Sequence, residues 1–268
     1  MSSRPKIFGH LLKDIIREEK CVACGTCVAV CPVNVLSIES GSPKLTGQCI
    51  ACGMCYANCP RASFDVVEME KELYGRNRSE DEALIGVHHA IFAVKTTDPG
   101  ILEHCQDGGA VSSILTQFLS DGGDAVIVAG LEEAAIWKAK PVVAMMKKQI
   151  IENAGTKYTP SPTLTGVQEA YSDYNKRNIA VVGTPCQMRG LSLIGTGEFS
   201  NAELEDTVKL RIGLFCMETF NHDSFIEYLE NEGLEPAKLE KFEIKNGRFY
   251  AYQGGENVFK VKPVSYTH

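Results

Sequence analysis

The chain carries two different hydrophobic patterns. From about residue 87 onward, short apolar runs alternate with segments in which apolar residues recur every three or four positions. The runs predict strands and the periodic segments predict helices. The expected strands are 88–97, 124–131, 141–146, 179–183 and 208–216, and the expected helices are 108–123, 147–155, 163–178 and 222–233. This alternation predicts an α/β domain with a mixed sheet.

Two of the expected helices have a defined apolar face, and a turn is expected near the end of the chain. The face of 108–123 consists of Val111, Ile114, Leu115, Phe118 and Leu119. The face of 163–178 consists of Leu164, Val167, Tyr171 and Tyr174. Residues 242–252 predict a hairpin, because Asn246-Gly247 favours a two-residue turn.

The first part of the chain has shorter apolar runs and more turns. Residues 35–40 and 43–47 predict a hairpin around Gly41, and residues 63–70 predict a closing strand. The charged stretch 70–83 then predicts a solvated linker or an exposed helix. We therefore expect an α+β protein in which a small first domain precedes the larger α/β domain.

Composition restricts the class of protein. The 268 residues are 44% hydrophobic and 23% charged, with a formal net charge of -7, which predicts a soluble globular chain with two domains. The acidic balance gives no electrostatic reason to expect a nucleic-acid partner. The N-terminus lacks the pattern of a secretory signal, and no run approaches the roughly 18 apolar residues of a membrane span. We expect a cytoplasmic protein without a transmembrane segment.

Eleven cysteines in such a chain indicate metal or redox chemistry rather than disulfides. Eight of them form two runs with the spacing C-x2-C-x2-C-x3-C-P, at 21–32 and 49–60. This spacing is typical of bacterial ferredoxins with two 4Fe-4S clusters, in which the fourth cysteine of each run binds the other cluster. The expected ligand sets are Cys21, Cys24, Cys27 and Cys59 for the first cluster, and Cys49, Cys52, Cys55 and Cys31 for the second.

Zinc is the alternative interpretation of these cysteines. A structural zinc site is commonly built from two separated pairs of ligands, whereas each run here carries four cysteines at iron-sulfur spacing. Gly25 and Gly53 allow the tight turns that three converging thiolates need. We therefore expect a ferredoxin-like domain with two 4Fe-4S clusters at 1–70, a linker at 71–86 and the second domain at 87–268.

Three loops of the second domain are candidates for ligand contacts. The loops QDGGAVSS (106–113), AGTKYTPSP (154–162) and GTPCQMRG (183–190) adjoin expected strands or helices, where α/β proteins place ligands. Neither G-x-G-x-x-G nor a Walker A run occurs. Each loop also has an ordinary interpretation: Asp107 as a helix cap, 157–162 as a rigid surface loop and Cys186 as a buried thiol.

These loops and GLFCMETF (213–220) occur in the order and approximate spacing of one family. Across residues 20–262 the chain resembles the beta subunits of coenzyme F-420 hydrogenase and of F-420-linked dehydrogenases, including members with a two-cluster ferredoxin unit in front. The resemblance implies that 87–268 binds FAD. The flavin-binding residues that it implies are Gln106, Asp107, Gly108, Gly109, Gly155, Thr156, Lys157, Tyr158, Ser161, Pro162, Thr184, Pro185 and Gln187.

The resemblance further implies an oxidoreductase subunit that moves electrons between coenzyme F-420 and the clusters. F-420 is its substrate, and hydrogenase, dehydrogenase or reductase subunits of a redox complex are its partners. FAD is needed between them because a deazaflavin passes hydride whereas a cubane cluster takes one electron. No catalytic side chain is expected, and His88, His89, His104 and His222 have an ordinary interpretation as surface or core residues.

Two alternative functions stay open at this point. The first is a flavin and iron-sulfur reductase of the same family that uses another substrate. The second is a ferredoxin-type carrier or docking module, whose second domain only binds a partner.

The resemblance also implies a third 4Fe-4S cluster beside the flavin. In the family its ligands are two cysteines that correspond to Cys186 and Cys216, and a later C-x-x-C pair. That pair is absent from this sequence, so we expect a chain truncated at its C-terminus, whose full-length form holds the third cluster. Cys186 and Cys216 should then lie within reach of one another at adjacent strand ends. The alternative is two unrelated buried thiols.

Overall fold

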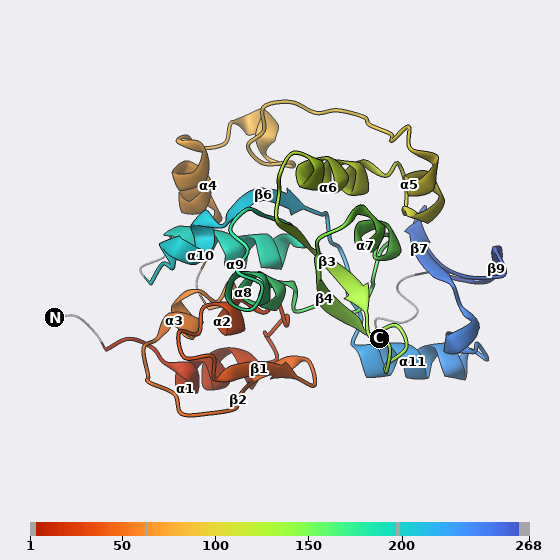
Figure 1. The fold of residues 1–268 in the computed structure, drawn as a ribbon. Helices are drawn as coiled ribbons and strands as arrows, with labels where there is room; N and C mark the ends of the chain where they lie inside the picture. The colour runs from red at the N-terminus through yellow and green to blue at the C-terminus, as the bar shows by residue number, and fades with distance from the viewer. Residues whose placement is uncertain (1–3, 63, 197–198, 263–268) are drawn as a thin grey trace.

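The computed structural model describes residues 4–62, 64–196 and 199–262 (Figure 1). The strands are β1 (Leu36–Glu39), β2 (Ser42–Leu45), β3 (Ala125–Leu131), β4 (Ala139–Ala144), β5 (Ile179–Gly183), β6 (Val208–Gly213), β7 (Lys241–Lys245), β8 (Arg248–Gln253) and β9 (Glu256–Val261). The helices of the first part are α1 (Phe8–Leu11), the π-helical turn η1 (Leu12–Ile16), α2 (Thr26–Ala29), α3 (Met54–Ala57), α4 (Val66–Tyr74) and the 3-10 turn η2 (Glu80–Glu82).

The remaining helices belong to the second part of the chain. They are α5 (Pro99–His104), α6 (Ala110–Ser120), α7 (Lys147–Glu152), α8 (Thr163–Ser172), α9 (Pro185–Thr196), α10 (Ala202–Asp206), α11 (His222–Asn231) and the 3-10 turn η3 (Pro236–Lys238). Among the described residues, no helix is long and apolar enough to cross a membrane.

A mixed four-stranded sheet forms the centre of the molecule, as the sequence predicts. Its order is β4-β3-β5-β6, with β3, β5 and β6 parallel and β4 antiparallel to β3. Alternate residues of β3 lie on opposite faces of the sheet. Ile127 packs with α8 and α9, whereas Val126 and Val128 pack with α6 and α7. The sheet is therefore covered by helices on both faces.

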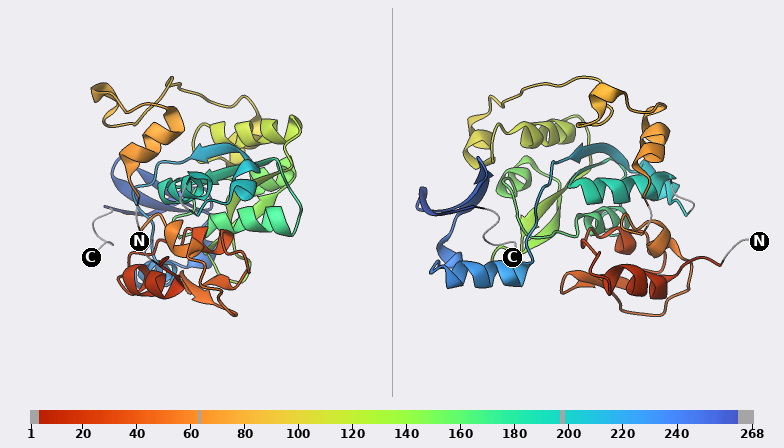
Figure 2. Two further views of the ribbon diagram at one scale, coloured as in Figure 1. Left: turned by 90° about the vertical axis from the view of Figure 1, so that its left-hand side faces the viewer. Right: turned by 180° about the vertical axis from the view of Figure 1, so that it is seen from behind.

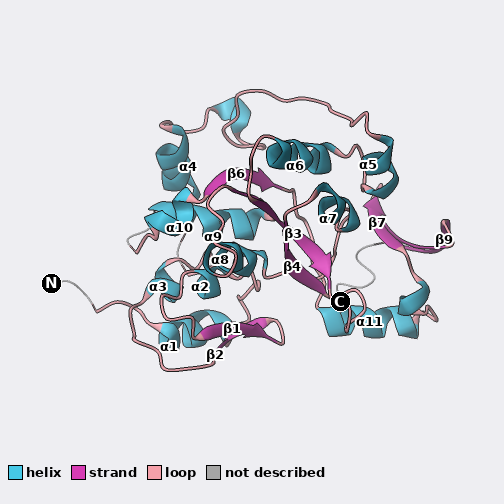
Figure 3. Ribbon diagram, in the orientation of Figure 1, coloured by secondary structure: helices cyan, strands magenta, loops and turns pink. Residues whose placement is uncertain are grey.

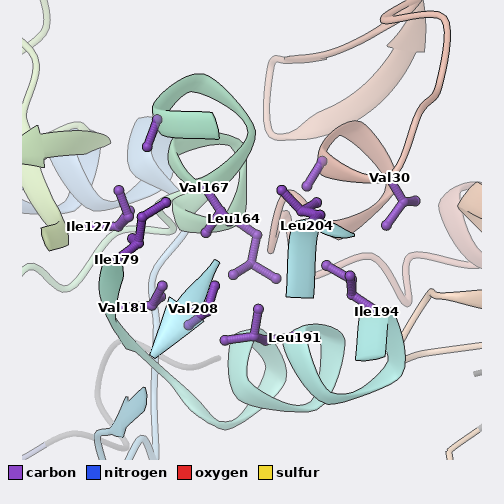
Figure 4. Packing of buried hydrophobic residues seen from close by; sticks show 12 residues of the cluster. Val30, Ile127, Leu164, Val167, Ile179, Val181, Leu191, Ile194, Leu204 and Val208 are labelled. Carbon is purple, nitrogen blue, oxygen red and sulfur yellow. The ribbon is translucent and has the colours of Figure 1, made fainter. Parts of the chain in front are cut away.

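The ferredoxin-like part packs directly against one of these helical layers. Ala29 and Val30 of the α2 region join the core cluster that contains Leu164 and Leu191. Figure 4 shows Val30 approaching this cluster from the ferredoxin-like side. Figure 2 shows from two further directions that this part lies beside the helices and not at the end of a free tether.

Close packing at this contact explains Gly25. Its φ of 89° is left-handed, and a Cβ at this position would lie 2.7 Å from the carbonyl oxygen of Pro162. The N–H of Leu164 donates to the carbonyl oxygen of Cys24 at 3.2 Å. Glycine is required here by the neighbouring domain as well as by the turn.

Both predicted hairpins are confirmed. β1 and β2 pair antiparallel on either side of Gly41, from Leu36 with Leu45 to Glu39 with Ser42. β7 and β8 pair around Asn246 and Gly247, whose φ values of 51° and 65° fit a type I′ turn. β9 extends β7 and β8 into a separate three-stranded sheet, which packs its aromatic residues against α11.

Two predicted strands are wrong. Residues 64–70 do not close the ferredoxin-like sheet; Val66–Tyr74 is the helix α4, because the Asp65 carboxylate accepts from the N–H groups of Val67 and Glu68 and caps it. Position 63 lies outside the described residues. Residues 88–97 are not a strand but a loop that passes over α6 (Figure 3). Ile91 and Phe92 are largely exposed there.

The helix faces are confirmed in most positions. Leu115 is buried and Val111, Phe118 and Leu119 pack beside it, but Ile114 is 47% exposed, so the α6 face is narrower than predicted. In α8, Leu164 and Val167 are fully buried and Tyr171 packs against them. Tyr174 is exposed, because the helix ends at Ser172.

Candidate cofactor sites

The first candidate site is a pocket in the ferredoxin-like part. Cys21, Cys24, Cys27 and Cys59 line it, together with apolar residues that include Leu11 and Ile15. The space at this pocket, including open solvent at its mouth, is about 360 Å³. The four thiols are those that the spacing assigns to the first cluster, and Cys59 reaches them from the second run.

The second pocket mirrors the first. Cys49, Cys52 and Cys55 line it with Cys31, which comes from the first run, and the corresponding space is about 340 Å³. Gly53, with φ 89°, starts α3 as Gly25 starts α2. The repeated turn therefore places three thiols of one run and one thiol of the other around each pocket.

The thiols of each pocket influence one another electrostatically. Burial raises the pKa of Cys27 far above its ordinary value, and Cys24, Cys21 and Cys59 raise it further. Burial raises the pKa of Cys55 to about 12, with added contributions from Cys52, Cys49 and Cys31. Cys27 and Cys55 are deprotonated only if a cation compensates their charge, and the iron of a cluster is such a cation. The pockets therefore fit 4Fe-4S clusters.

A single metal ion fits less well. Among the described residues, no group of three or more His, Cys, Asp or Glu side chains could hold one metal ion. A cubane is larger than an ion and keeps its four ligands farther apart, so this finding does not bear on a cluster.

Cys186 and Cys216 lie near one another at the carboxyl edge of the central sheet. Cys186 is in the first turn of α9, directly after β5, and Cys216 follows β6. Partial desolvation raises the pKa of Cys216, although the residue is exposed, and the neighbouring Cys186 raises it further. Cys186 also raises the pKa of Cys21 and of Cys24, after burial as the main cause. Cys186 is therefore close enough to interact electrostatically with Cys216 and with two thiols of the first pocket.

The loop that precedes α6 is held by close backbone packing. A Cβ on Gly108 would lie 2.8 Å from the carbonyl oxygen of Val94, and one on Gly109 would lie 2.7 Å from Thr96 Cγ2. Asp107 does not cap α6; Gly109 precedes the helix without a side-chain cap, and Asp107 is exposed. Gln106 reaches the neighbouring loop, where its Oε1 accepts from the N–H of Thr156 at 3.4 Å.

The second loop follows α7. Lys157 Nζ donates to the carbonyl oxygens of Asn153, Ala154 and Gly155 and so caps the end of α7. Burial lowers the pKa of Lys157 to about 8. The hydroxyl of Tyr158 accepts from the N–H of Ile244 at 3.0 Å, which ties this loop to β7.

Gln187, one of the expected flavin-binding residues, joins two loops. Gln187 is buried; its Oε1 accepts from the N–H of Thr184 at 2.8 Å. Its Nε2 donates to the carbonyl oxygen of Ser161 at 2.7 Å and to Thr163 Oγ1 at 3.0 Å. Both polar atoms of Gln187 are thus used within the protein. Pro162, next to Ser161, contacts Gly25, whereas Pro185 is exposed at the start of α9.

Two glutamine side chains therefore link the loops that contain the expected residues. Gln106 joins the 106–109 loop to Thr156, and Gln187 joins Ser161 to the turn at Thr184. Sequence analysis missed Thr163, which holds Gln187, and Glu218, whose side chain has a buried atom near Cys216. Only the position of Glu218 within the GLFCMETF segment could have indicated the second of these.

Sequence models of one family cover most of the second part. The C-terminal model of coenzyme F-420 hydrogenase/dehydrogenase, beta subunit, matches residues 176–266, and the N-terminal model matches residues 91–168. A 4Fe-4S dicluster domain matches residues 13–71.

Individual relatives agree with these matches. The coenzyme F-420 hydrogenase subunit beta of Methanothermobacter thermautotrophicus is 33% identical over 69% of this chain and 66% of its own length. The corresponding subunit of Methanosarcina barkeri is 30% identical over 70% of this chain and 65% of its own length. The chain thus spans just under two thirds of these two relatives. The coenzyme F-420-dependent sulfite reductase of Methanocaldococcus jannaschii is 31% identical over 91% of this chain and 38% of its own length.

A solved structure shares the fold. A chain of the F-420-reducing NiFe hydrogenase complex from Methanosarcina barkeri matches with a TM-score of 0.61 and 31% identity. The match covers 65% of this chain and 60% of that chain.

Proposed function

Because the chain belongs to the coenzyme F-420 hydrogenase/dehydrogenase beta subunit family and carries a 4Fe-4S dicluster domain at its N-terminus, we propose that it is an iron-sulfur flavoprotein subunit. Its proposed activity is to move electrons between coenzyme F-420 and the clusters of a partner redox complex. Hydrogenase, dehydrogenase or reductase subunits are the proposed partners.

The observation that carries this proposal is a continuous row of cysteine sites. Cys216 neighbours Cys186, and Cys186 neighbours Cys21 and Cys24 of the first pocket. Cys27 of the first set neighbours Cys55 of the second. The row therefore links the carboxyl edge of the central sheet, where α/β proteins bind ligands, to the first pocket and then to the second.

We assign the ligands as the pockets group them. Cys21, Cys24, Cys27 and Cys59 hold one 4Fe-4S cluster, and the second set holds another. The domains are 1–70, with the clusters, and 87–268, joined by the linker 71–86. Cys186 and Cys216 are two of the ligands of a third cluster, and their position beside the first pocket supports this assignment.

The carboxyl edge of the sheet is the proposed site of FAD. When bound, FAD supplies exchange between the two electrons of a hydride and the single electrons of clusters. The loops 106–109, 155–162 and 184–187 form its walls, and Gln187 and Gln106 keep these walls together. Lys157 contributes to this site indirectly. Its ammonium group already donates to three carbonyl oxygens at the end of α7, and so it stabilises the point at which the 155–162 loop begins.

One relative favours a second acceptor for the same electrons. The sulfite reductase from Methanocaldococcus jannaschii matches across both parts of this chain, and its name combines dependence on F-420 with sulfite. The same F-420 input can therefore serve different terminal reactions, and we propose that the partner, not this chain, decides which one.

The test compares electron donors. Protein reconstituted anaerobically with iron, sulfide and FAD is mixed with reduced F-420, with NADPH or with reduced ferredoxin, and bleaching of the flavin and cluster absorption is followed by stopped flow. We expect fast bleaching with reduced F-420 and little with NADPH. Fast bleaching with reduced ferredoxin alone would favour a reductase with another donor, and protein that retains no flavin would favour a simple ferredoxin-type carrier.

A further inference from the structure

Glu218 has a polar atom that the fold does not satisfy. Its Oε2 is buried and has no hydrogen-bond partner among the described residues. Such atoms are rare in native proteins, because a buried carboxylate oxygen without a donor destabilises the fold. Within the part of the chain that the structure describes, the only other such side-chain atom is Oδ1 of Asn58, in the ferredoxin-like part.

Glu218 lies among the loops of the proposed flavin site. The next two residues bind the 155–162 loop: Thr219 Oγ1 and the N–H of Phe220 donate to the carbonyl oxygen of Tyr158 at 3.2 and 2.8 Å. On its other side, Cys216 Sγ donates to the carbonyl oxygen of Glu218 at 3.6 Å, and Cys216 neighbours Cys186. Glu218 therefore sits between the second loop and the turn that carries Cys186.

Glu218 Oε2 needs a hydrogen-bond donor, and this need restricts the class of ligand that can lie beside it. A carboxylate is negatively charged and only accepts hydrogen bonds, so it repels phosphate and the sulfides of a cluster. Lys157, the cation of the 155–162 loop, is already used by the end of α7. An oxidised flavin ring and a deazaflavin ring each present one imide N–H, and a carboxylate accepts from it well.

We propose that Glu218 accepts a hydrogen bond from the imide N–H of a flavin or deazaflavin ring and so orients that ring at the ends of β5 and β6. This proposal rests on the proposed function, since it needs such a ring at the carboxyl edge of the sheet. Glu218 is then a binding residue that the family resemblance does not assign.

The experiment uses ligands with and without the donor. The affinity of wild type, Glu218→Gln and Glu218→Ala for FAD and for N3-methylated FAD is measured by fluorescence titration with reconstituted protein. The same protein, loaded with FAD, is titrated with F-420 and with its N3-methylated analogue to obtain dissociation constants. Glu230→Ala, on the exposed side of α11, is the matched control.

We expect wild type to bind the methylated ligand at least about tenfold more weakly, because a hydrogen bond to a charged group is lost. Glu218→Ala should bind both forms alike, and Glu218→Gln should lie between. A difference in the FAD titration assigns Glu218 to the flavin, and one in the F-420 titration assigns it to the deazaflavin. Equal discrimination by wild type and Glu218→Ala in both titrations overturns the proposal.

Thermal unfolding separates this role from a structural one. Without flavin, Glu218→Ala should have a higher Tm than wild type, because an unsatisfied buried atom is removed. A lower Tm together with unchanged ligand discrimination would show that Glu218 serves only the fold. Failure of wild type to bind either ring would instead overturn the proposed function itself, and this inference with it.

Discussion

The cysteines of the ferredoxin-like part and the pair at the end of the central sheet are held in different ways. Each ferredoxin pocket takes its four thiols from two short runs, and Cys27, Cys31, Cys55 and Cys59 belong to the same apolar cluster as Phe8 and Leu11. Cys186 and Cys216 come from two strand ends thirty residues apart, and Cys216 is exposed.

This difference shows what each kind of site depends on. The ferredoxin pockets depend on local spacing, and their thiols are part of the core that surrounds them. The Cys186 and Cys216 pair depends on β5 and β6 lying next to one another, so the fold of the whole second part creates it. The first region should need its metal in order to fold, whereas the central sheet should not.

The largest expected effect is therefore that of iron removal. Chelation under anaerobic conditions should unfold residues 7–60, because the iron-thiolate bonds that join the two cysteine runs are lost, while the central sheet stays folded. Hydrogen exchange measured by mass spectrometry should show protection lost in 7–60 by orders of magnitude and retained in β3 and β5. Equal loss in both regions would show that the sheet also depends on the clusters.

The next largest effect is expected in the core of the central sheet, which should fold without metal. Leu164→Ala should lower the free energy of unfolding by about 2 to 5 kcal/mol, because Leu164 is fully buried between the sheet and α2. Ile114→Ala is the control, since its half-exposed side chain should change stability by no more than about 0.5 kcal/mol. Urea denaturation measures both; similar losses in the two variants would refute the assignment of this core.

A smaller effect should appear at the contact between the two regions. Gly25→Ala should destabilise the protein by about 1 to 3 kcal/mol, because the left-handed φ disfavours a side chain and the Cβ meets the carbonyl oxygen of Pro162. Gly41→Ala has a similar φ of 75° but open space around it, so it should cost about 1 kcal/mol. The difference between their thermal shifts measures the domain contact, and equal shifts would mean that the contact adds nothing.

The smallest effect is local and depends on pH. Arg76, and after it the N–H of Ser79, hold the pKa of Glu82 well below its ordinary 4.5. A lowered pKa in the folded state means that this contribution to stability is complete above pH 4.5 and is lost as pH falls through the folded value. Glu82→Gln should therefore speed hydrogen exchange at 79–88 at pH 7 but change little at strongly acidic pH. The same pH 7 effect in the exposed control Glu80→Gln would contradict this.

Sequence patterns predicted the elements whose signals are local. The spacing of the cysteine runs predicts the same groups that line the two pockets, and the apolar runs predict β3, β4, β5 and β6. The Asn246-Gly247 turn is equally local, since both residues favour the positive φ values that it needs.

Features that depend on distant partners were missed. An apolar run at 88–97 has the composition of a strand, yet the four-stranded sheet leaves it unpaired and it runs over α6 as a loop. The apolar pattern of 63–70 predicted a strand, but 66–74 is a helix because the side chain of Asp65 caps it. The hydrogen bonds of Gln187 to Ser161 and Thr163 were not predicted, because these residues become its neighbours only through the fold.

The central claim is that this chain contains two complete cluster sites in its ferredoxin-like part, and native mass spectrometry of the anaerobically reconstituted 268-residue chain tests it most directly. The account predicts the mass of two 4Fe-4S clusters on wild type, one on Cys24→Ser and two on Cys186→Ser. An unchanged cluster count in Cys24→Ser, or a cluster lost in Cys186→Ser, would contradict it.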